Sequence, residues 1–295
     1  MRRMMQLQGV LVPMVTPLFE ADGVDVAGVT GLAEHLLDAD SVDGLFAIGA
    51  TGEYTRLSPA ERIQVIEALG QADRKGKLIA ANVGGADRQE MTRFAAAASR
   101  AGLDAIAAVV PGSIDPVPEA LYEHFAPLQE CGLPLMVYWS PMEKEQKPSL
   151  ERIEALLRIP SFAGLKDSSR DMEVFAAMCA EAGEEISVFQ GVEMLHLPSL
   201  VCGSAGIIGG GLNLYAALLV QITRHFESHE LAAAMRLQRQ VSTNWEQLNR
   251  HQSFRWLVKR VWAERGLIAG THCRESDDAP VSGVEMDRIR SMVAL

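Results

Sequence analysis

Cysteine is scarce in this sequence. The four cysteines, Cys131, Cys179, Cys202 and Cys273, are scattered and form no CxxC pair. In a chain of 295 residues this pattern argues against a disulfide framework. We therefore interpret the cysteines as reduced thiols of a cytosolic protein, most of which fill its core.

Long apolar runs are also missing. No stretch approaches the ~20 apolar residues that a membrane-spanning helix needs. At the N-terminus two arginines precede some apolar residues, but Gln6, Gln8 and Pro13 interrupt them and no small-residue cleavage site follows. We therefore predict no signal peptide. Together these absences favour a soluble protein of the cytoplasm.

Positive charge is in deficit, and the formal net charge is -11. Nucleic acids and anionic membranes attract basic surfaces, so we expect neither as a partner. An anionic small-molecule substrate remains compatible, because local groups in a site can oppose the global charge. The composition, 48% hydrophobic and 22% charged, is that of a globular protein with a large core.

Short apolar or β-branched runs recur along the chain and predict eight strands. They cover residues 9–15, 44–49, 77–83, 104–110, 133–139, 162–166, 186–190 and 205–210. Segments with helical spacing lie between them. Residues 58–76 begin with Ser-Pro and an acidic first turn and end at Gly76, and residues 87–102 follow the same pattern with Gly102 as the stop. Residues 148–160 and 170–183 repeat it.

Buried strands that alternate with helices predict parallel βαβ units. Eight such units favour an α/β fold of the closed (β/α)8, or TIM-barrel, type over an open sheet. From about residue 214 the pattern is only helical, with a long amphipathic stretch around 231–265. We therefore predict a barrel over residues 1–225 and, over residues 226–295, a C-terminal helical extension packed on the same core.

Reactive side chains gather at the predicted carboxyl ends of the strands, where barrels of this kind place their active sites. Lys166 and Tyr138 end two neighbouring strands, and the turns GATGE (49–53) and GIIGGG (206–211) follow two others. An unpaired ammonium is costly to bury, so Lys166 is a candidate nucleophile. Partial desolvation lowers a lysine pKa toward neutrality, and the neutral amine attacks carbonyls.

The other features suit the same chemistry. An imine withdraws electrons from the adjacent carbon, and Tyr138 on the next strand can transfer the proton that bond breaking requires. Backbone N–H groups and a threonine hydroxyl in a glycine-rich turn can hold the carboxylate of a 2-oxo acid without an arginine.

At this point the sequence resembles the dihydrodipicolinate synthase / N-acetylneuraminate lyase family of class I, Schiff-base aldolases and lyases. The likeness runs over nearly the whole chain. The motifs that carry it are GVLVPMVTPL (9–18), GATGE followed by LSPAER (57–62), Tyr138 before a proline, GLKDSS (164–169), QGVE (190–193) and AGIIGGGLN (205–213).

The resemblance implies a role for individual residues. Lys166 would form the imine with pyruvate or a longer 2-oxo acid, and Tyr138 would shuttle protons. Thr51 and the backbone around Ala50 match the turn that binds the substrate carboxylate.

Two further positions match the family's pattern. The backbone of Ile208 would contact the pyruvyl group, and Gly191 would keep room beside it. The resemblance implies a homotetramer, and Schiff-base chemistry needs no metal or other cofactor.

Three features depart from the synthase branch of that family. Glu143 stands where the synthases carry an arginine for the carboxylate of their second substrate. Ala50 replaces a relay threonine, and Gly112 and Ser113 replace a tyrosine pair. We therefore expect a lyase, aldolase or dehydratase that acts on another 2-oxo acid, such as a 2-keto-3-deoxy sugar acid or a hydroxy-oxoglutarate. The alternative is 4-hydroxy-tetrahydrodipicolinate synthase.

Plainer interpretations stand beside each assignment. Lys166 could extend to solvent from a strand end, Tyr138 could pack at the rim, and Thr51 could be a turn residue only. We expect Glu53 to be a structural hydrogen-bonding group.

Three alternatives concern function. GIIGGG could cradle a phosphate, although the run has no cationic or hydroxyl side chain. His225 and His229 are four residues apart, but they do not form an HExxH motif, and a solvated helix face is expected. A protein with this fold could also bind a 2-oxo acid without catalysis.

Overall fold

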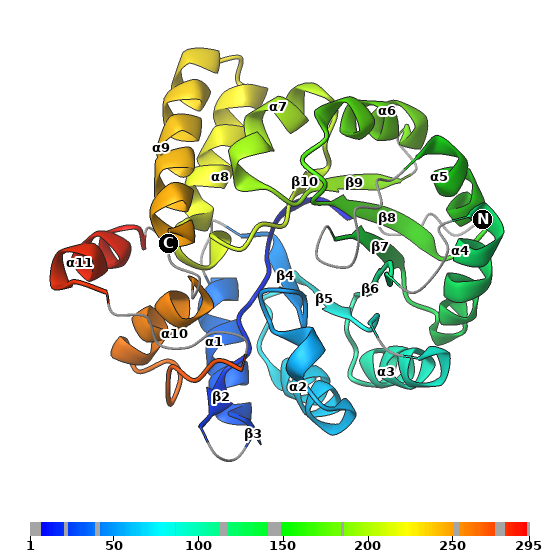
Figure 1. The fold of residues 1–295 in the computed structure, drawn as a ribbon, viewed down its shortest axis with the longest axis horizontal. Coiled ribbons are helices and arrows are strands. Elements are labelled where there is room, and N and C mark those ends of the chain that lie inside the picture. Colours follow the sequence, from blue (N-terminus) through cyan, green and yellow to red (C-terminus); the bar gives the residue numbers. More distant parts are fainter. Residues whose placement is uncertain are drawn as a thin grey trace.

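The computed structural model describes residues 7–20, 23–38, 42–85, 87–112, 117–140, 149–183, 186–250, 254–274 and 281–293. Eight parallel strands close into a barrel in the order β1-β10-β9-β8-β7-β6-β5-β4, with helices around it (Figure 1). The strands are β1 (Gly9–Val12), β4 (Gly44–Ala47), β5 (Leu78–Asn82), β6 (Ala105–Val109), β7 (Leu135–Trp139), β8 (Phe162–Asp167), β9 (Ser187–Gln190) and β10 (Gly206–Ile207). Each falls within or one residue beyond a predicted run, so the predicted barrel is confirmed.

Helices connect the strands. They are α1 (Val26–Asp38), α2 (Pro59–Gln71), α3 (Arg88–Arg100), α4 (Pro118–Phe125), α5 (Leu150–Leu157), α6 (Met172–Ala182), α7 (His196–Val201) and α8 (Leu212–Glu227). Short 3-10 helices cover Tyr54–Arg56, Ala126–Cys131 and Glu193–Leu195.

Local capping explains where α2 begins and where α3 ends. Ser58 caps α2 in a capping box with Glu61, which satisfies N–H groups that the first helical turn leaves without partners. Gly102 follows α3 with a φ of 74°, a left-handed conformation that glycine adopts without steric cost. The predicted end of α2 at Gly76 is late, because the helix stops at Gln71 and a turn follows.

The C-terminal helices lie together on one side of the barrel, with α9 alongside α8 (Figure 1). They are α9 (Leu231–Asn249), α10 (Phe254–Glu264) and α11 (Gly283–Ser291). The long helical stretch expected around 231–265 is therefore two helices. In α10 the fully buried Trp262 stacks edge-on against His35 of α1, with ring centroids 5.4 Å apart, so this helix packs on the barrel's outer layer.

Two features of the fold were not predicted from the sequence. An antiparallel ribbon of β2 (Leu18–Phe19) and β3 (Gly23–Val24) follows the first barrel strand, and strands of two residues leave no readable alternation. In addition, α8 is kinked at Tyr215, whose backbone is not helical. The division of the chain at residue 225 remains a prediction. Within the described residues, no helix is both long and apolar enough to cross a bilayer.

Candidate active site

Lys166 lies near the carboxyl end of β8 and is buried, with 5% of its surface exposed. Its Nζ is 4.1 Å from the centroid of the Tyr138 ring and 4.5 Å from the centroid of the Phe46 ring. The two rings come from β7 and β4 and meet edge to face. The amine is therefore enclosed by aromatic faces inside the barrel, and the alternative of a solvated strand-end lysine does not describe it.

Burial lowers the pKa of Lys166 below the ordinary value of a lysine, although Tyr138 and Glu193 nearby favour the charged form. Desolvation by burial disfavours the ammonium more than these two neighbours stabilise it. The consequence is a larger fraction of neutral amine near pH 7 than an exposed lysine would have. A neutral amine is the form that adds to a carbonyl.

Tyr138 is held in a network of hydrogen bonds. Burial by itself raises the pKa of its phenol, but the charge of Lys166 and hydrogen bonds with Ser140, Ser168 and Lys166 outweigh it, so the net pKa lies below the ordinary value. A phenol with hydroxyl neighbours and a lowered pKa is suited to proton transfer. Ser140 and Ser168 were not predicted.

A period-two pattern could have revealed both serines. Ser140 lies two residues after Tyr138, and Ser168 two residues after Lys166. Residues at this spacing along a strand point to the same face.

Glu193 is a second buried ionisable group that the sequence reasoning missed. It opens the 3-10 helix after β9 and is 1% exposed. Its Oε1 accepts a hydrogen bond of 2.5 Å from the Gly211 N–H. Burial raises the pKa of this carboxyl, despite that hydrogen bond and the charge of Lys166. A Cβ on Gly209 would come within 2.5 Å of its Cδ, so the GIIGGG turn leaves space for this side chain rather than for a phosphate.

Tyr215 lies under the same turn. Its side chain is fully buried, and its hydroxyl has no hydrogen-bond partner in the part of the chain that the structure describes. Burial, and next the charge of Glu193, raise the pKa of this phenol well above its ordinary value, so it stays protonated. A Cβ on Gly211 would collide with the Tyr215 hydroxyl, which explains the glycine at this position.

The GATGE turn leads from β4 toward the barrel mouth. Thr51 is 7% exposed, and its Oγ1 lies 3.4 Å from where a Cβ on Gly210 would be. The turn that follows β4 and the turn that follows β10 therefore meet. Ala50 precedes Thr51, and its carbonyl oxygen accepts hydrogen bonds from Glu53 N–H and Arg255 Nε.

Gly191 and Ile208 directly follow β9 and β10, which are neighbouring strands of the barrel. The N–H of Ile208, which is fully buried, donates to Gln190 O at 2.9 Å. Gly191 N–H donates to Asp167 O at 2.7 Å, and a Cβ on Gly191 would collide with the Ser168 hydroxyl. The substrate contacts of both residues stay predictions.

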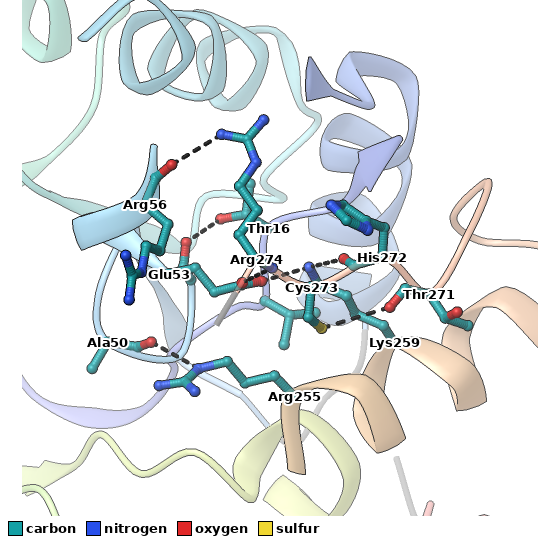
Figure 2. Close-up of polar contacts among 12 residues, drawn as sticks. Thr16, Ala50, Glu53, Arg56, Arg255, Lys259, Thr271, His272, Cys273 and Arg274 are labelled. Atoms are coloured by element: carbon teal, nitrogen blue, oxygen red, sulfur yellow. Dashed lines mark hydrogen bonds and ion pairs between the residues drawn. The ribbon is translucent and has the colours of Figure 1, made fainter. Parts of the chain in front are cut away.

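Glu53 makes the structural contacts expected of it, and both carboxylate oxygens are used. Oε1 lies 2.7 Å from Lys259 Nζ, and Oε2 accepts from Arg274 N at 2.6 Å. Figure 2 shows these contacts converging on Glu53 from the C-terminal segment. The C-terminal extension therefore contacts the GATGE turn through Lys259 and Arg274.

In the described ranges no group of three or more His, Cys, Asp or Glu side chains is arranged so that it could hold a metal ion. His225 instead contacts Glu230 through Nδ1 at 2.5 Å. Ser113 and Glu143 lie outside the described residues, and Gly112 is at the edge of a described range.

Comparisons with known proteins show which family the chain resembles. The model of the "Dihydrodipicolinate synthetase family" matches residues 6–293. A 4-hydroxy-tetrahydrodipicolinate synthase of Listeria monocytogenes is 30% identical over 240 residues, which cover 80% of this chain and 82% of that one. An N-acetylneuraminate lyase of Citrobacter koseri is 28% identical over 98% of this chain and 96% of its own length.

Solved structures show the same fold. CdNal from Clostridium difficile, in complex with mannosamine, superposes with a TM-score of 0.90 at 21% identity and covers 98% of this chain and 100% of that one. A dihydrodipicolinate synthase from Bacteroides thetaiotaomicron gives 0.86 at 23% identity, with 97% of each chain covered. With a matching family model over nearly its whole length, the chain belongs to the dihydrodipicolinate synthetase family.

Proposed function

We propose that this protein is a class I lyase or aldolase that forms a Schiff base between Lys166 and pyruvate or a longer 2-oxo acid. The observation that carries the proposal is the buried amine of Lys166 beside the phenol of Tyr138. Membership of a family whose named members are synthases and lyases supports it.

The reaction follows from these groups. The neutral amine of Lys166 adds to the 2-oxo carbon, and loss of water gives the imine. Tyr138 then takes the proton of the substrate's 4-hydroxyl, the bond between C3 and C4 breaks, and its electron pair moves into the imine as an enamine. An aldehyde leaves. Return of the proton to C3 and hydrolysis release pyruvate and the free lysine.

The carboxylate of the substrate needs a partner throughout. We place it at Thr51 and at the backbone N–H groups of the turn that Ala50 opens. Oriented N–H groups in a turn bind anions, and Thr51 approaches Gly210 of the turn that also contains Ile208, which supports a contact of Ile208 with the pyruvyl group. Gly191 keeps the neighbouring space open.

The proposed cleavage activity is tested with a panel of 4-hydroxy-2-oxo acids that includes 2-keto-3-deoxy sugar acids and a hydroxy-oxoglutarate. Release of pyruvate is followed with a coupled lactate dehydrogenase. We expect turnover of at least one member and none by Lys166→Ala. Pyruvate release by Lys166→Ala at the rate of the unmodified protein would remove Lys166 from the mechanism.

Synthase activity is the alternative, and relatives that carry that name favour it. Glu143, where the synthases have an arginine, would repel the distal carboxylate of aspartate semialdehyde. We expect this repulsion and the missing bidentate contact to cost several decades in catalytic efficiency, on the order of 2–5 kcal/mol. Steady-state condensation of pyruvate with aspartate semialdehyde above about 1 s⁻¹ would restore the synthase assignment.

A binding protein without catalysis is the other alternative. It would still form the imine with pyruvate, but it would release no product from any member of the panel. Imine formation without turnover is therefore the result that favours it.

We further propose a homotetramer. An apolar hollow between α7 and α9 supports a contact with a second copy: Val201, Leu231 and Met235 on its rim are 70%, 50% and 46% exposed. Burying such side chains is favourable. Sedimentation should show that Met235→Glu dissociates, whereas Val284→Glu, at an apolar side chain on α11 that is 64% exposed, stays assembled. If Met235→Glu leaves the tetramer intact, the hollow between α7 and α9 is not a subunit interface.

We place the enzyme in the cytoplasm. All four cysteines are free thiols, as expected of a reducing compartment. Fractionation of the source cells would test this, and recovery outside the cytoplasm would contradict it.

A further inference from the structure

Arg255 reaches from the first turn of α10 to the GATGE turn. Its Nε donates a hydrogen bond of 3.0 Å to Ala50 O, across 205 positions of sequence. Figure 2 shows the guanidinium beside the Ala50 carbonyl. Hydrogen bonds from a charged donor are roughly twice as strong as neutral ones, so this contact fixes the Ala50 carbonyl firmly.

A buried ion pair holds the other end of the turn. The side chains of Glu53 and Lys259 are both fully buried, and Lys259 Nζ also donates to His272 O at 2.6 Å. Thr16 adds a hydrogen bond from Oγ1 to Gly52 O at 2.8 Å. Three sides of a short turn are thus fixed by segments distant in sequence.

The turn needs such support because its backbone is strained. Ile48 has a φ of 56° and Glu53 a φ of 59°. For a β-branched residue such as Ile48 the left-handed region is strongly disfavoured. Conformations of this kind persist only where the surroundings impose them, and they cluster at binding sites.

The geometry of a peptide bond links Arg255 to the substrate side of the turn. The Ala50 carbonyl and the Thr51 N–H belong to one planar trans peptide, so they point in opposite directions. With the carbonyl held by Arg255, the Thr51 N–H points away from α10. In the described part of the chain neither this N–H nor the Thr51 hydroxyl has a hydrogen-bond partner, so both are available to a ligand.

We propose that Arg255 is a positioning residue for the substrate carboxylate: it fixes and polarises the Ala50–Thr51 peptide so that the Thr51 N–H binds the anion. The guanidinium itself does not touch the substrate. Its charge on the carbonyl oxygen draws electrons from the peptide and strengthens the N–H as a donor. This inference rests on the proposed function and makes the C-terminal extension part of the anion site.

The test measures imine formation rather than turnover. Unmodified protein, Arg255→Met and Arg255→Lys are incubated with increasing pyruvate and then reduced with borohydride, and the adduct is quantified by intact mass. Acetone, a ketone without a carboxylate, is the second probe. Arg260→Met is the matched control, because Arg260 lies on the same helix and pairs at its surface with Glu264. Circular dichroism checks that each variant is folded.

We expect Arg255→Met to raise the pyruvate concentration for half-maximal trapping by about tenfold or more, the worth of a hydrogen bond to a charged group. Arg255→Lys, which keeps the charge, should raise it less. Trapping of acetone should be unchanged in both, and Arg260→Met should match the unmodified protein with both probes.

Two results would overturn the inference alone. One is half-maximal trapping of pyruvate by Arg255→Met within about twofold of the unmodified protein, which is below the effect of one such bond. The other is an equal loss with pyruvate and acetone, which is the signature of a general structural role. Absence of any pyruvate adduct in the unmodified protein would instead overturn the proposed function, and this inference with it.

Discussion

Tyr138 and Lys166 are register partners on the adjacent parallel strands β7 and β8. Neighbours at one register position project to the same face of a sheet, and the barrel's closure turns that face inward. The phenol and the amine are therefore brought together by the strand pairing itself, on a rigid element rather than on a mobile loop. This pairing places the proton-transfer group beside the nucleophile.

Replacing Tyr138 by phenylalanine should separate imine formation from turnover. Tyr138→Phe keeps the ring beside Lys166 but removes the hydroxyl, so borohydride trapping with pyruvate should persist. Turnover should fall by roughly 10²–10⁴-fold, the usual contribution of a positioned acid–base group. Steady-state cleavage and trapping, measured on one preparation, give both values. Near-normal turnover would assign proton transfer to another hydroxyl, such as Ser113.

The pH dependence of imine formation should reveal the lowered pKa of Lys166. Burial lowers the pKa of Lys166 in the folded protein, so the initial rate of trapping should rise with pH and level off below the ordinary lysine pKa of about 10.4. Stopped reactions with pyruvate across a pH series measure the midpoint. A midpoint at the ordinary value would mean that the reacting amine is exposed to water.

Asp167 should make the fold less stable as pH rises through mildly acidic values. Burial raises the pKa of this carboxyl to about 6, whereas in the unfolded chain it titrates near 4. The cost of its buried charge is absent below about pH 4, grows between about pH 4 and 6 and is complete above, at about 3 kcal/mol.

Asp167→Asn tests this directly in urea unfolding. The variant should gain stability relative to the unmodified protein as pH increases over that window. Glu173→Gln, which changes an exposed carboxylate at the start of α6, is the control and should show no such trend. A pH-independent difference for Asp167→Asn would show that the carboxyl titrates normally.

Removing one partner of the Glu53–Lys259 ion pair should destabilise the fold, whereas removing both charges should have a much smaller effect. Lys259→Met leaves a fully buried carboxylate without its cation, and we expect the free energy of unfolding to fall by about 3–5 kcal/mol. The double variant Glu53→Gln/Lys259→Met removes both charges and should recover most of that loss. A double-mutant cycle in urea gives the coupling. If the free energy of unfolding lost in the double variant equalled the sum of the losses in Glu53→Gln and Lys259→Met, the two side chains would not be coupled and this prediction would be wrong.

The barrel could be predicted because its strands are buried on both faces and are therefore continuously apolar. Lys166 could be singled out for the same reason, since a charged residue interrupts such a run. Glu193, whose charge acts on Lys166, and Tyr215, which lies near Glu193, could not, because a glutamate after a strand and a tyrosine in a helix are ordinary at the sequence level. Only the glycines of the GIIGGG turn bring them together.

The contacts between the C-terminal extension and the GATGE turn could not be predicted from the sequence. Arg255 and Lys259 are four residues apart, so they lie on the same face of an amphipathic helix. Charged residues on such a helix usually face solvent. Their partners Ala50 and Glu53 lie about two hundred residues away. No local pattern encodes a contact at that separation, and it depends on how α10 packs against the barrel.

The most direct test of the account is the location of the covalent adduct. The protein is incubated with pyruvate, reduced with borohydride, digested and analysed by tandem mass spectrometry. We predict one reduced pyruvyl adduct, on the peptide that contains Lys166, and no adduct in Lys166→Ala. An adduct on another lysine, or one that persists in Lys166→Ala, would contradict the assignment of Lys166 as the nucleophile.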